Sequence, residues 1–534
     1  MAAAKRWRVL VSDEVAEEGL AVLREHPGVE LVVKPGLAPE ALRSELQQAE
    51  ALLVRSATKV TADLLSGAPK LTVIGRAGVG VDNIDVEAAT QRGIVVCNSP
   101  EGNTVAAAEH TMALMLALAR NIPAANASVA AGEWKRGAFV GVELLNKTLG
   151  VIGLGKIGSE VALRASAFGM RVVGHDPFVA GDRAERLAAE VVDFPELLAR
   201  SDFITIHVPQ TRETQHLIGR DTLAKVKRGV RIINCSRGSV IDEAALADAI
   251  ADGTVAGAGL DVFETEPPAG SPLLGLKNVV LTPHLGASTA EAQLKVAVDV
   301  AQQVLDVLEG KPARSAVNVI PVSPEALRAI EFYLPLAEKL GSLQGQLAER
   351  PVRSVEMVYA GQLAEEDSRL LTRAFLKGLL SPVIDEPVNL VNASIVAESR
   401  GLRVIESRSL HPEDYVSLIT SRVSADDGER VIAGTLFGRR EARIVRMDGY
   451  RVDFAPEGHM LVSMHIDKPG MIGHVGTILG RHGVNIAGMH VGRERPRPGG
   501  LSVMVLAVDG PIPPHVMEEL RQVDGIKTAQ LVEL

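Results

Sequence analysis

Short apolar runs alternate with stretches of helical spacing through the first part of the chain. The apolar runs lie at residues 8–11, 30–33, 51–54, 71–74 and 94–97. A helix is expected over residues 15–24. Because short buried strands that alternate with helices build parallel sheets, we predict a small α/β domain. The turn-forming residues 98–102 interrupt the pattern, so a hinge is expected there.

A second α/β pattern follows the hinge. Its apolar runs predict strands at residues 149–152, 170–176, 203–208, 230–234 and 279–281. The first of these runs is followed by a glycine-rich turn and then by helical spacing. Farther along, Ser288 and Glu291 form a capping box that is expected to open a long helix ending at Gly310. This helix is expected to return the chain to the first domain.

The pattern changes again in the C-terminal part of the chain. Residues 319–455 contain strand-like pieces such as 353–359 but no cluster of catalytic residue types, which favours a structural or regulatory role. From residue 456 the order is strand, helix, strand, strand, helix, strand. Asp467 is predicted to cap the first of these helices, and Gly483 is predicted to end it.

Length, charge and cysteine content exclude some classes of protein function. A chain of 534 residues should hold several domains, because single hydrophobic cores stop growing at roughly 250–300 residues. The net charge of −10 comes without a basic stripe, which argues against nucleic acid and anionic membranes as partners. Cys97 and Cys235 are far apart and lack metal-ligand spacing, so neither a disulfide framework nor a metal site is expected, and a cytoplasmic protein fits.

The glycine-rich turn at residues 153–158 can hold a pyrophosphate. Gly153 permits the tight turn, Gly155 allows close approach of phosphates, and Gly158 allows helix and strand to pack closely. Such a turn is weak evidence alone, because glycine-rich turns are common in α/β proteins. Asp176 at the end of the next strand lies where a carboxylate binds the ribose hydroxyls, so the sequence favours NAD over NADP.

Two strand ends of the first domain carry cations. Arg55 and Ser56 follow one strand, and Arg76 with Gly78 follows another. In open α/β sheets ligands bind outside the carboxyl ends of strands, so these residues are candidates for an anion site. Ordinary solvated surface charge is the alternative interpretation.

Three polar residues after later strands could perform the chemistry of alcohol oxidation. His284 could take the hydroxyl proton, Glu266 could orient its ring, and Arg237 could hold a substrate carboxylate. Taken singly, each of them is also typical of an ordinary surface or loop residue.

Five motifs with these residues resemble the D-2-hydroxyacid dehydrogenase family. They lie at residues 76–85, 153–158, 234–238, 261–267 and 283–289. The rest of the chain resembles the long form of the family, which adds an intervening domain and an ACT domain. The resemblance implies an α/β fold in which a Rossmann-type NAD domain is inserted in a flavodoxin-like substrate domain, followed by an α+β intervening domain and a C-terminal ACT (βαββαβ) domain. The implied boundaries are 1–101 and 287–318 for the substrate domain, 102–286 for the NAD domain, 319–455 for the intervening domain and 456–534 for the ACT domain.

The resemblance also implies an activity. It is the oxidation of 3-phospho-D-glycerate to 3-phosphooxypyruvate with NAD, the first step of L-serine biosynthesis, with His284 as general base and Arg237 and Glu266 completing the catalytic set. Two alternatives stay open: another D-2-hydroxyacid dehydrogenase activity, such as 2-oxoglutarate or glyoxylate reduction, and a non-enzymatic NAD-responsive sensor of the same fold.

The matching positions imply three sets of binding residues. The cofactor shell comprises Val79, Gly153, Gly155, Lys156, Ile157, Gly158, Asp176, Val208, Cys235, Ser236, Arg237, Asp261, His284, Gly286 and Ala287. The substrate set comprises Arg55, Ser56, Arg76, Gly78, Lys135, Arg136 and Arg237. In the family the pair Lys135 and Arg136 can come from a neighbouring subunit, so a homodimer or homotetramer is implied. His465, Asp467 and Asn485 match positions where the effector L-serine binds in relatives, although a strand residue, a helix cap and a turn would explain them almost as well.

Overall fold

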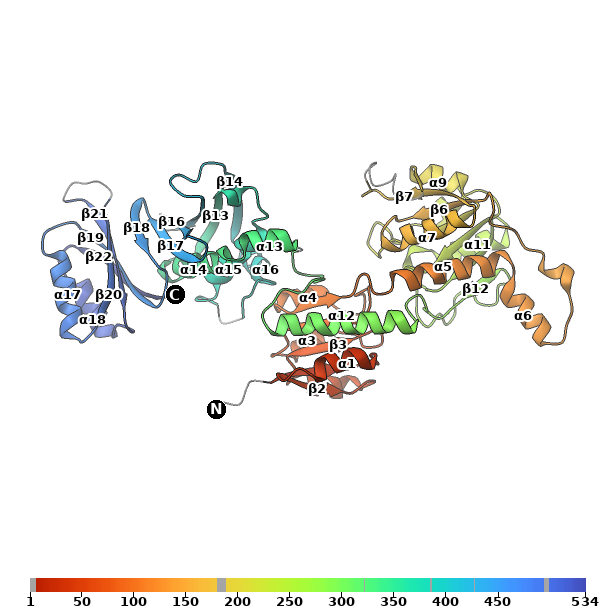
Figure 1. Cartoon of the computed structure of the whole chain (residues 1–534), viewed down its shortest axis with the longest axis horizontal. Helices are drawn as coiled ribbons and strands as arrows, with labels where there is room; N and C mark the ends of the chain where they lie inside the picture. The colour runs from red at the N-terminus through yellow and green to blue at the C-terminus, as the bar shows by residue number, and fades with distance from the viewer. Residues whose placement is uncertain (1–5, 180–188, 321, 385–386, 427, 494–498) are drawn as a thin grey trace.

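Four β-sheets follow one another along the described part of the chain. The computed structural model describes residues 6–179, 189–320, 322–384, 387–426, 428–493 and 499–534. Figure 1 shows the second sheet at one end of the molecule and the fourth at the other, with the first and third sheets between them. The chain therefore passes through the second sheet before it returns beside the first.

The first sheet is parallel, with the strand order β2-β1-β3-β4-β5. Its strands are β1 (Trp7–Val11), β2 (Val29–Val33), β3 (Ala51–Val54), β4 (Val73–Arg76) and β5 (Val95–Asn98), and its helices are α1 (Glu17–Arg24), α2 (Pro39–Leu46), α3 (Ala62–Ser66) and α4 (Val86–Gln91). This order is the flavodoxin-like one. β4 begins two residues later than expected, so Arg76 is its last residue.

Helix α12 (Ala290–Leu308) confirms the expected return to the first sheet. It crosses α1 and β4 where Gly19 and Gly75 carry no side chain, and a Cβ on Gly19 would lie 2.7 Å from Ala297. The N-cap is Thr289, whose hydroxyl accepts from the Ala292 N–H, so the helix begins one residue later than the capping box at Ser288 predicts. Thr289 is also a good cap, and backbone geometry decided between the two.

The second sheet is parallel and has the order β12-β11-β10-β9-β6-β7-β8. Its strands are β6 (Thr148–Ile152), β7 (Arg171–His175), β8 (Glu190–Val191), β9 (Phe203–Ile206), β10 (Val230–Asn234), β11 (Val255–Leu260) and β12 (Val279–Leu281). The helices around it include α5 (Thr104–Ala119), α7 (Lys156–Ala167), α9 (Phe194–Arg200), α10 (Arg220–Leu223), α11 (Glu243–Ala251) and the 3₁₀ turn η2 (Gly238–Val240). Counted from β6, this is the doubly wound Rossmann order.

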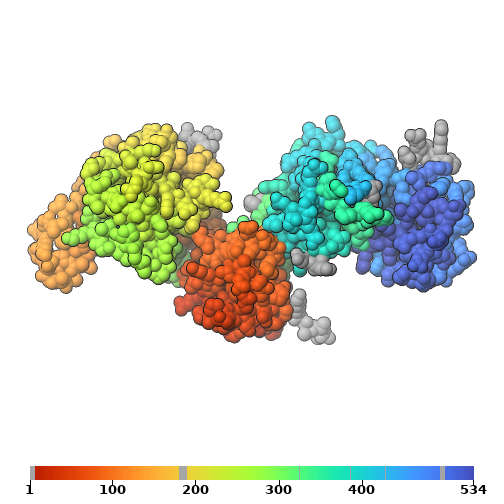
Figure 2. Space-filling view, turned by 180° about the vertical axis from the view of Figure 1, so that it is seen from behind, coloured from red at the N-terminus to blue at the C-terminus, as the bar shows by residue number. Residues whose placement is uncertain are grey.

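An arm extends from the second sheet between α5 and β6. It spans residues 122–140 and contains α6 (Ile122–Ala130) and the 3₁₀ turn η1 (Arg136–Phe139). Both views show it on the side of the sheet that faces away from the first sheet (Figures 1 and 2). The arm carries exposed apolar side chains, among them Trp134 and Val140.

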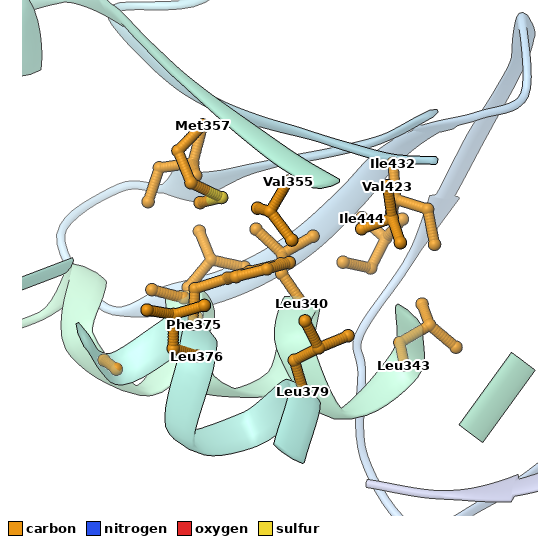
Figure 3. Packing of buried hydrophobic residues seen from close by; sticks show 14 of the residues in the cluster. Leu340, Leu343, Val355, Met357, Phe375, Leu376, Leu379, Val423, Ile432 and Ile444 are labelled. Carbon is orange, nitrogen blue, oxygen red and sulfur yellow. The ribbon is translucent and has the colours of Figure 1, made fainter. Parts of the chain in front are cut away.

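The third sheet is mixed and lies against helices on one face. Its order is β14-β13-β15-β16-β17-β18, from β13 (Val352–Gly361), β14 (Arg403–Ser409), β15 (Ser417–Ala425), β16 (Gly428–Phe437), β17 (Glu441–Met447) and β18 (Tyr450–Phe454). The accompanying helical segments are α13 (Pro324–Ile330), α14 (Tyr333–Leu347), η3 (Gln362–Ala364), α15 (Arg369–Leu380) and α16 (Ala393–Ser399). Figure 3 shows Leu340 and Phe375 of the helices facing Val355 and Ile444 of the sheet.

Helices α14 and α15 approach each other through glycines. A Cβ on Gly341 would lie 1.9 Å from the Phe375 carbonyl oxygen, and one on Gly378 would lie 1.9 Å from that of Glu338. Because both obstacles are backbone atoms, no side-chain rotation could relieve the clash. Glycine is therefore required at this crossing.

The fourth sheet is antiparallel, and its elements confirm the expected βαββαβ order. They are β19 (His459–Ile466), α17 (Met471–Arg481), β20 (Ile486–Arg493), β21 (Leu501–Val508), α18 (Pro514–Arg521) and β22 (Ile526–Glu533), with strand order β20-β21-β19-β22. The prediction that Asp467 caps α17 is wrong, because the N-cap is Gly470 in the left-handed conformation with no side-chain cap. Gly483 follows the helix with φ of 71° and ends it as expected.

The third and fourth sheets share one hydrophobic core. Met460, Val503 and Val532 of the fourth sheet belong to the same buried cluster as Leu340 and Phe375. The Gln346 side chain of α14 exchanges two hydrogen bonds with the Glu533 backbone on β22. Within the described part of the chain, no helix has the length and apolar character needed to cross a membrane.

Replacing Gly378 by Ala should destabilise the third-sheet region by about 1–3 kcal/mol, because the added methyl forces α14 and α15 apart. Gly473 on α17 is the matched control, since a Cβ there meets nothing within 4 Å. Gly473→Ala should be neutral or gain up to about 1 kcal/mol from helix propensity. Scanning calorimetry of both variants checks this, and equal transition temperatures would contradict it.

Candidate active site

The candidate residues of the first two sheets lie at the carboxyl ends of parallel strands. Arg76 ends β4, the glycine turn follows β6, and Asp176 follows β7. Residues 235–238, 261–267 and 282–287 follow β10, β11 and β12 in the same way. Parallel strands present all their carboxyl ends at one edge, so residues far apart in sequence meet there.

The glycine turn has the geometry of a phosphate cradle. A Cβ on Gly153 would lie 2.5 Å from the His207 carbonyl oxygen, and one on Gly158 would lie 2.0 Å from the Gly153 carbonyl oxygen. A Cβ on Gly155, in contrast, would meet nothing within 4 Å. Gly155 is also the N-cap of α7 and supplies no side-chain cap. Two glycines therefore serve packing, and the third leaves the helix N-terminus open to an anion, which fits the pyrophosphate of NAD.

Asp176 is held at the tip of β7 beside this turn. Its Oδ2 accepts a hydrogen bond of 2.9 Å from the Leu154 N–H, and its Oδ1 accepts one of 2.9 Å from the Phe178 N–H. These bonds fix the carboxylate next to the phosphate cradle. A carboxylate in this arrangement can accept hydrogen bonds from the ribose hydroxyls of a dinucleotide.

His284 and Glu266 form the contact that general base catalysis requires. His284 Nδ1 lies 2.9 Å from Glu266 Oε2, which leaves Nε2 on the other side of the ring for a substrate. Burial alone would raise the pKa of Glu266, but the hydrogen bond and charge of His284 outweigh burial and lower this pKa. Glu266 is therefore ionised at neutral pH and can stabilise an imidazolium on His284.

The loop that carries His284 is organised by Asp261. The Asp261 side chain is fully buried, and its carboxylate accepts hydrogen bonds from the backbone N–H groups of Leu285 and Gly286 at 2.7 and 2.8 Å. Its Oδ1 also accepts from the Thr282 hydroxyl at 2.6 Å. With its oxygens occupied inside the protein, Asp261 is better described as a support beneath the loop than as a side chain facing a ligand.

Arg237 connects the second sheet to the first. Its Nε donates to Asp82 Oδ2 at 2.8 Å, and its guanidinium lies beside Gly80. Arg76 is close by: burial, and then the charge of Arg237, lower the pKa of Arg76 to about 10, so it stays a cation at neutral pH. The Arg76 Nε has no hydrogen-bond partner among the described residues. Two guanidinium groups thus converge on one small region, as binding of an anionic substrate requires.

A second ion pair joins the glycine turn to the segment between the two sheets. Lys156 of the glycine turn pairs with Glu101, which lies between β5 and α5. Arg55 is held differently: its N–H donates to the buried Asp13 and its guanidinium to the Glu14 carbonyl oxygen. The charge of Arg55 contributes to lowering the pKa of Arg76, so Arg55 belongs to the same cationic region. Ser56 beside it is exposed.

Lys135 and Arg136 do not join this region within one chain. Both lie on the arm, where Lys135 pairs with Glu133, and the arm points away from the first sheet (Figure 2). A direct contact of these two residues with a substrate held by Arg55 and Arg76 in the same chain is therefore excluded by the geometry.

The remaining predicted cofactor residues lie around the glycine turn and the loops beside it. Val79, Ile157, Val208, Cys235 and Ser236 are half-buried. Burial raises the pKa of the Cys235 thiol to about 12, so this thiol stays protonated and is no nucleophile. Among the described residues, no cluster of side chains could hold a metal ion.

Two histidines were missed as site residues by sequence reasoning. His207 lies beside the glycine turn, and burial lowers its pKa to about 4. His110 lies on α5 with its Nε2 at 3.1 Å from Asp261. The signal for His207 was its position directly after a buried strand, whereas His110 sits in an apolar helix and gave no such signal.

The three predicted effector residues do not meet within one chain. His465 is buried and pairs in register with Ser502 at the start of β21, and Asp467 forms an ion pair with Arg493. Asn485 lies past the other end of β21, where its amide donates to Asp509 at 2.7 Å. Because β21 has eight residues, its ends are about 20 Å apart. One effector molecule cannot touch all three side chains of a single chain.

Three segments of the chain match described families. Residues 112–286 match the D-isomer specific 2-hydroxyacid dehydrogenase NAD binding domain, residues 329–448 match the D-3-phosphoglycerate dehydrogenase intervening domain, and residues 459–525 match the ACT domain. The first segment contains the second sheet, and the other two contain the third and fourth sheets except for their last strands in the sequence, β18 and β22.

Solved structures resemble a little more than half of the chain. A glyoxylate reductase from Paecilomyes thermophila covers 58% of this chain and 98% of its own, with a TM-score of 0.54 and 32% identity. A D-lactate dehydrogenase from Aquifex aeolicus, complexed with NAD and lactic acid, covers 58% and 98% with a TM-score of 0.52 and 30% identity.

Full-length relatives extend the similarity to the whole chain. The D-3-phosphoglycerate dehydrogenase of Archaeoglobus fulgidus is 48% identical over 528 residues, which are 99% of this chain and 100% of the relative. That of Bacillus subtilis is 45% identical with the same coverage. The chain therefore belongs to the D-isomer-specific 2-hydroxyacid dehydrogenases, a family of NAD-dependent enzymes, and within them to the D-3-phosphoglycerate dehydrogenases.

Proposed function

We propose that the chain oxidises 3-phospho-D-glycerate to 3-phosphooxypyruvate with NAD, the first step of L-serine biosynthesis. The observation that carries this proposal is the contact between His284 and Glu266 beside a cationic region that contains Arg237 and Arg76. The full-length similarity to D-3-phosphoglycerate dehydrogenases supports the choice of substrate.

The residues of the site have separate roles in this reaction. NAD, when bound, would supply the hydride acceptor for the oxidation of the substrate alcohol. His284 takes the hydroxyl proton at Nε2, while the ionised Glu266 holds the Nδ1–H and stabilises the imidazolium. Arg237 binds the substrate carboxylate and polarises the forming carbonyl, and Asp82 keeps its guanidinium oriented. The N-terminus of α7 and Asp176 hold the cofactor.

Two alternative functions can be compared with the oxidation of 3-phosphoglycerate. Glyoxylate or 2-oxoglutarate reduction would use the same His284. An unphosphorylated acid, however, would offer no phosphate for Arg55 and the arm cations to bind. A non-enzymatic NAD-responsive sensor does not require the contact between His284 and Glu266.

The proposal of a D-3-phosphoglycerate dehydrogenase also includes a cytoplasmic location and domain boundaries at residues 101, 286, 318 and 455.

Purified protein should form NADH from 3-phosphoglycerate and NAD, and His284→Ala should lower turnover by about 10²–10⁴ because the base is lost. NADH binding, measured by fluorescence, should be retained in the variant. Glu266→Gln serves as the intermediate case, since the ring keeps a partner but loses the carboxylate charge. Wild-type turnover in His284→Ala would overturn the role of the base, and NADH formation only from unphosphorylated acids would overturn the substrate.

We also propose that Lys135 and Arg136 serve the active site of a second chain. The arm points away from its own cationic region and exposes Trp134 and Val140, which supports a contact with another copy. A homodimer or homotetramer would then have substrate sites shared between chains.

Mixing two inactive variants tests the shared site. One variant is His284→Ala and the other is Lys135→Ala with Arg136→Ala. If the arm acts on the partner, hybrid dimers contain one intact site and should recover up to about a quarter of wild-type activity after refolding together. Glu133→Gln is the control on the same arm. Absence of recovery with hybrid dimers present by mass spectrometry would contradict the proposal.

We propose L-serine as an effector of the ACT domain. Because Asn485 lies at the opposite end of β21 from His465 and Asp467, one binding site would take Asn485 from one chain and His465 from another. The ion pair between Asp467 and Arg493 also means that an amino group must compete with Arg493 for this carboxylate.

L-Serine should lower the rate of NADH formation, and Asn485→Ala should weaken the inhibition by about tenfold or more in concentration, as expected for loss of a hydrogen bond to a charged ligand. Asp509→Ala is the matched control, because it removes only the partner of the Asn485 amide. Equal inhibition of wild type and Asn485→Ala would exclude Asn485 from the effector site.

A further inference from the structure

His110 lies at the centre of a hydrogen-bond network that none of the roles above uses. It is on α5, the helix that begins directly after the turn between the two sheets. Its Nε2 lies 3.1 Å from Asp261 Oδ1 and 3.1 Å from Thr282 Oγ1. The imidazole therefore reaches from this helix to the base of the loop that carries His284.

The hydrogen bonds determine which ring nitrogen of His110 carries a proton. The Asp261 carboxylate only accepts, and the single proton of the Thr282 hydroxyl is donated to Asp261 Oδ1 at 2.6 Å. Both neighbours of Nε2 thus offer lone pairs. Nε2 must carry a hydrogen, which it shares between the two oxygens.

Asp261 passes this constraint to the catalytic loop. Its carboxylate holds the N–H groups of Leu285 and Gly286, and its backbone carbonyl accepts from the His284 N–H at 2.8 Å. His284 has a φ of 56°, in the left-handed region that non-glycine residues rarely occupy. A backbone of this kind persists only where its surroundings hold it firmly.

Because the Asp261 carboxylate is buried, it depends on hydrogen-bond donors from the protein. Asp261 is completely buried, and burial alone would raise its pKa, but hydrogen bonds from His110, Thr282 and Leu285 outweigh burial and lower it. Without His110, a buried carboxylate oxygen loses one of its donors. The loop could then relax toward less strained backbone angles and move the His284 ring.

We propose that His110 is a positioning residue for the dehydrogenase reaction. It fixes the orientation of the His284 ring through Asp261 and Thr282. This inference rests on the proposed role of His284 as the base. The His110 Nε2 contacts Asp261 and Thr282, so His110 would act on His284 through these two residues. Its effect should therefore appear in the chemical step rather than in substrate binding.

Two substitutions of His110 separate positioning from simple packing. His110→Leu fills the space without a donor and should lower kcat on the order of 10- to 100-fold, as a misplaced catalytic group does, with KM for 3-phosphoglycerate changed less than about threefold. His110→Gln keeps an N–H donor of similar reach and should restore most of kcat. Glu109→Gln, an exposed neighbour on α5, is the matched control and should leave both constants unchanged.

A second readout does not depend on turnover. Amide hydrogen exchange of a peptide covering residues 282–288 should become faster in His110→Leu but not in Glu109→Gln, because the N–H groups of Leu285 and Gly286 lose a well-held acceptor. Thr282→Val removes the other neighbour of Nε2 and should lower kcat in the same direction. It also carries the test if His110→Leu does not fold.

The outcomes are distinguishable from failure of the proposed function. Wild-type kcat and wild-type exchange in both His110→Leu and Thr282→Val would overturn the positioning role while the activity of the enzyme stands. A KM increase without a change in kcat would also overturn it. If His284→Ala retains turnover, the function proposal fails, and the exchange measurement still decides whether His110 holds the loop.

Discussion

The buried carboxylate of Asp261 is the interaction on which the arrangement of the active site depends. It lies beneath the loop after β12 and satisfies two backbone N–H groups that would otherwise be unpaired inside the protein. The loop in turn places His284 in an unusual backbone conformation and directs its ring toward Glu266. An ionised carboxylate can remain buried only if donors surround it, so His110 and Thr282 are part of the same structure.

The two parallel sheets are brought into one site by charges that cross between them. Arg237 of the second sheet pairs with Asp82 of the first, and Lys156 of the glycine turn pairs with Glu101. Each pair uses a cation that is expected to bind a ligand. Substrate carboxylate and cofactor phosphate would therefore meet cations whose orientation is already set by a carboxylate from across the site, so less side-chain freedom is lost on binding.

The C-terminal part of the chain, which holds the third and fourth sheets, is tied to the first sheet by a few specific contacts. The Asn389 amide donates to the Gly93 carbonyl oxygen at 2.7 Å, and Asn392 reaches the Gln91 carbonyl oxygen. The fourth sheet shares its core with the third, so a displacement at the ACT end would be carried through packed side chains. The structure thus contains a continuous path of contacts from β22 to the turn before β5.

Local sequence patterns determined most of the elements in the two parallel sheets and the ACT order, because buried strands and glycine turns depend on nearest neighbours. The strand β11 (Val255–Leu260) was missed, since alternating Ala and Gly give little apolar signal. The caps differed from prediction at Thr289, one residue after Ser288, and at Gly470, three residues after Asp467, because several nearby residues can begin a helix and the tertiary structure selects between them. The sequence alone also singled out His284, Glu266 and Arg237 as catalytic candidates, and their catalytic roles stay a prediction. Only the tertiary structure decided that Lys135 and Asn485 lie away from their expected partners and that His110 contacts Asp261, which is 151 positions away in the sequence. These placements depend on how helices and whole sheets pack, and not on neighbouring residues.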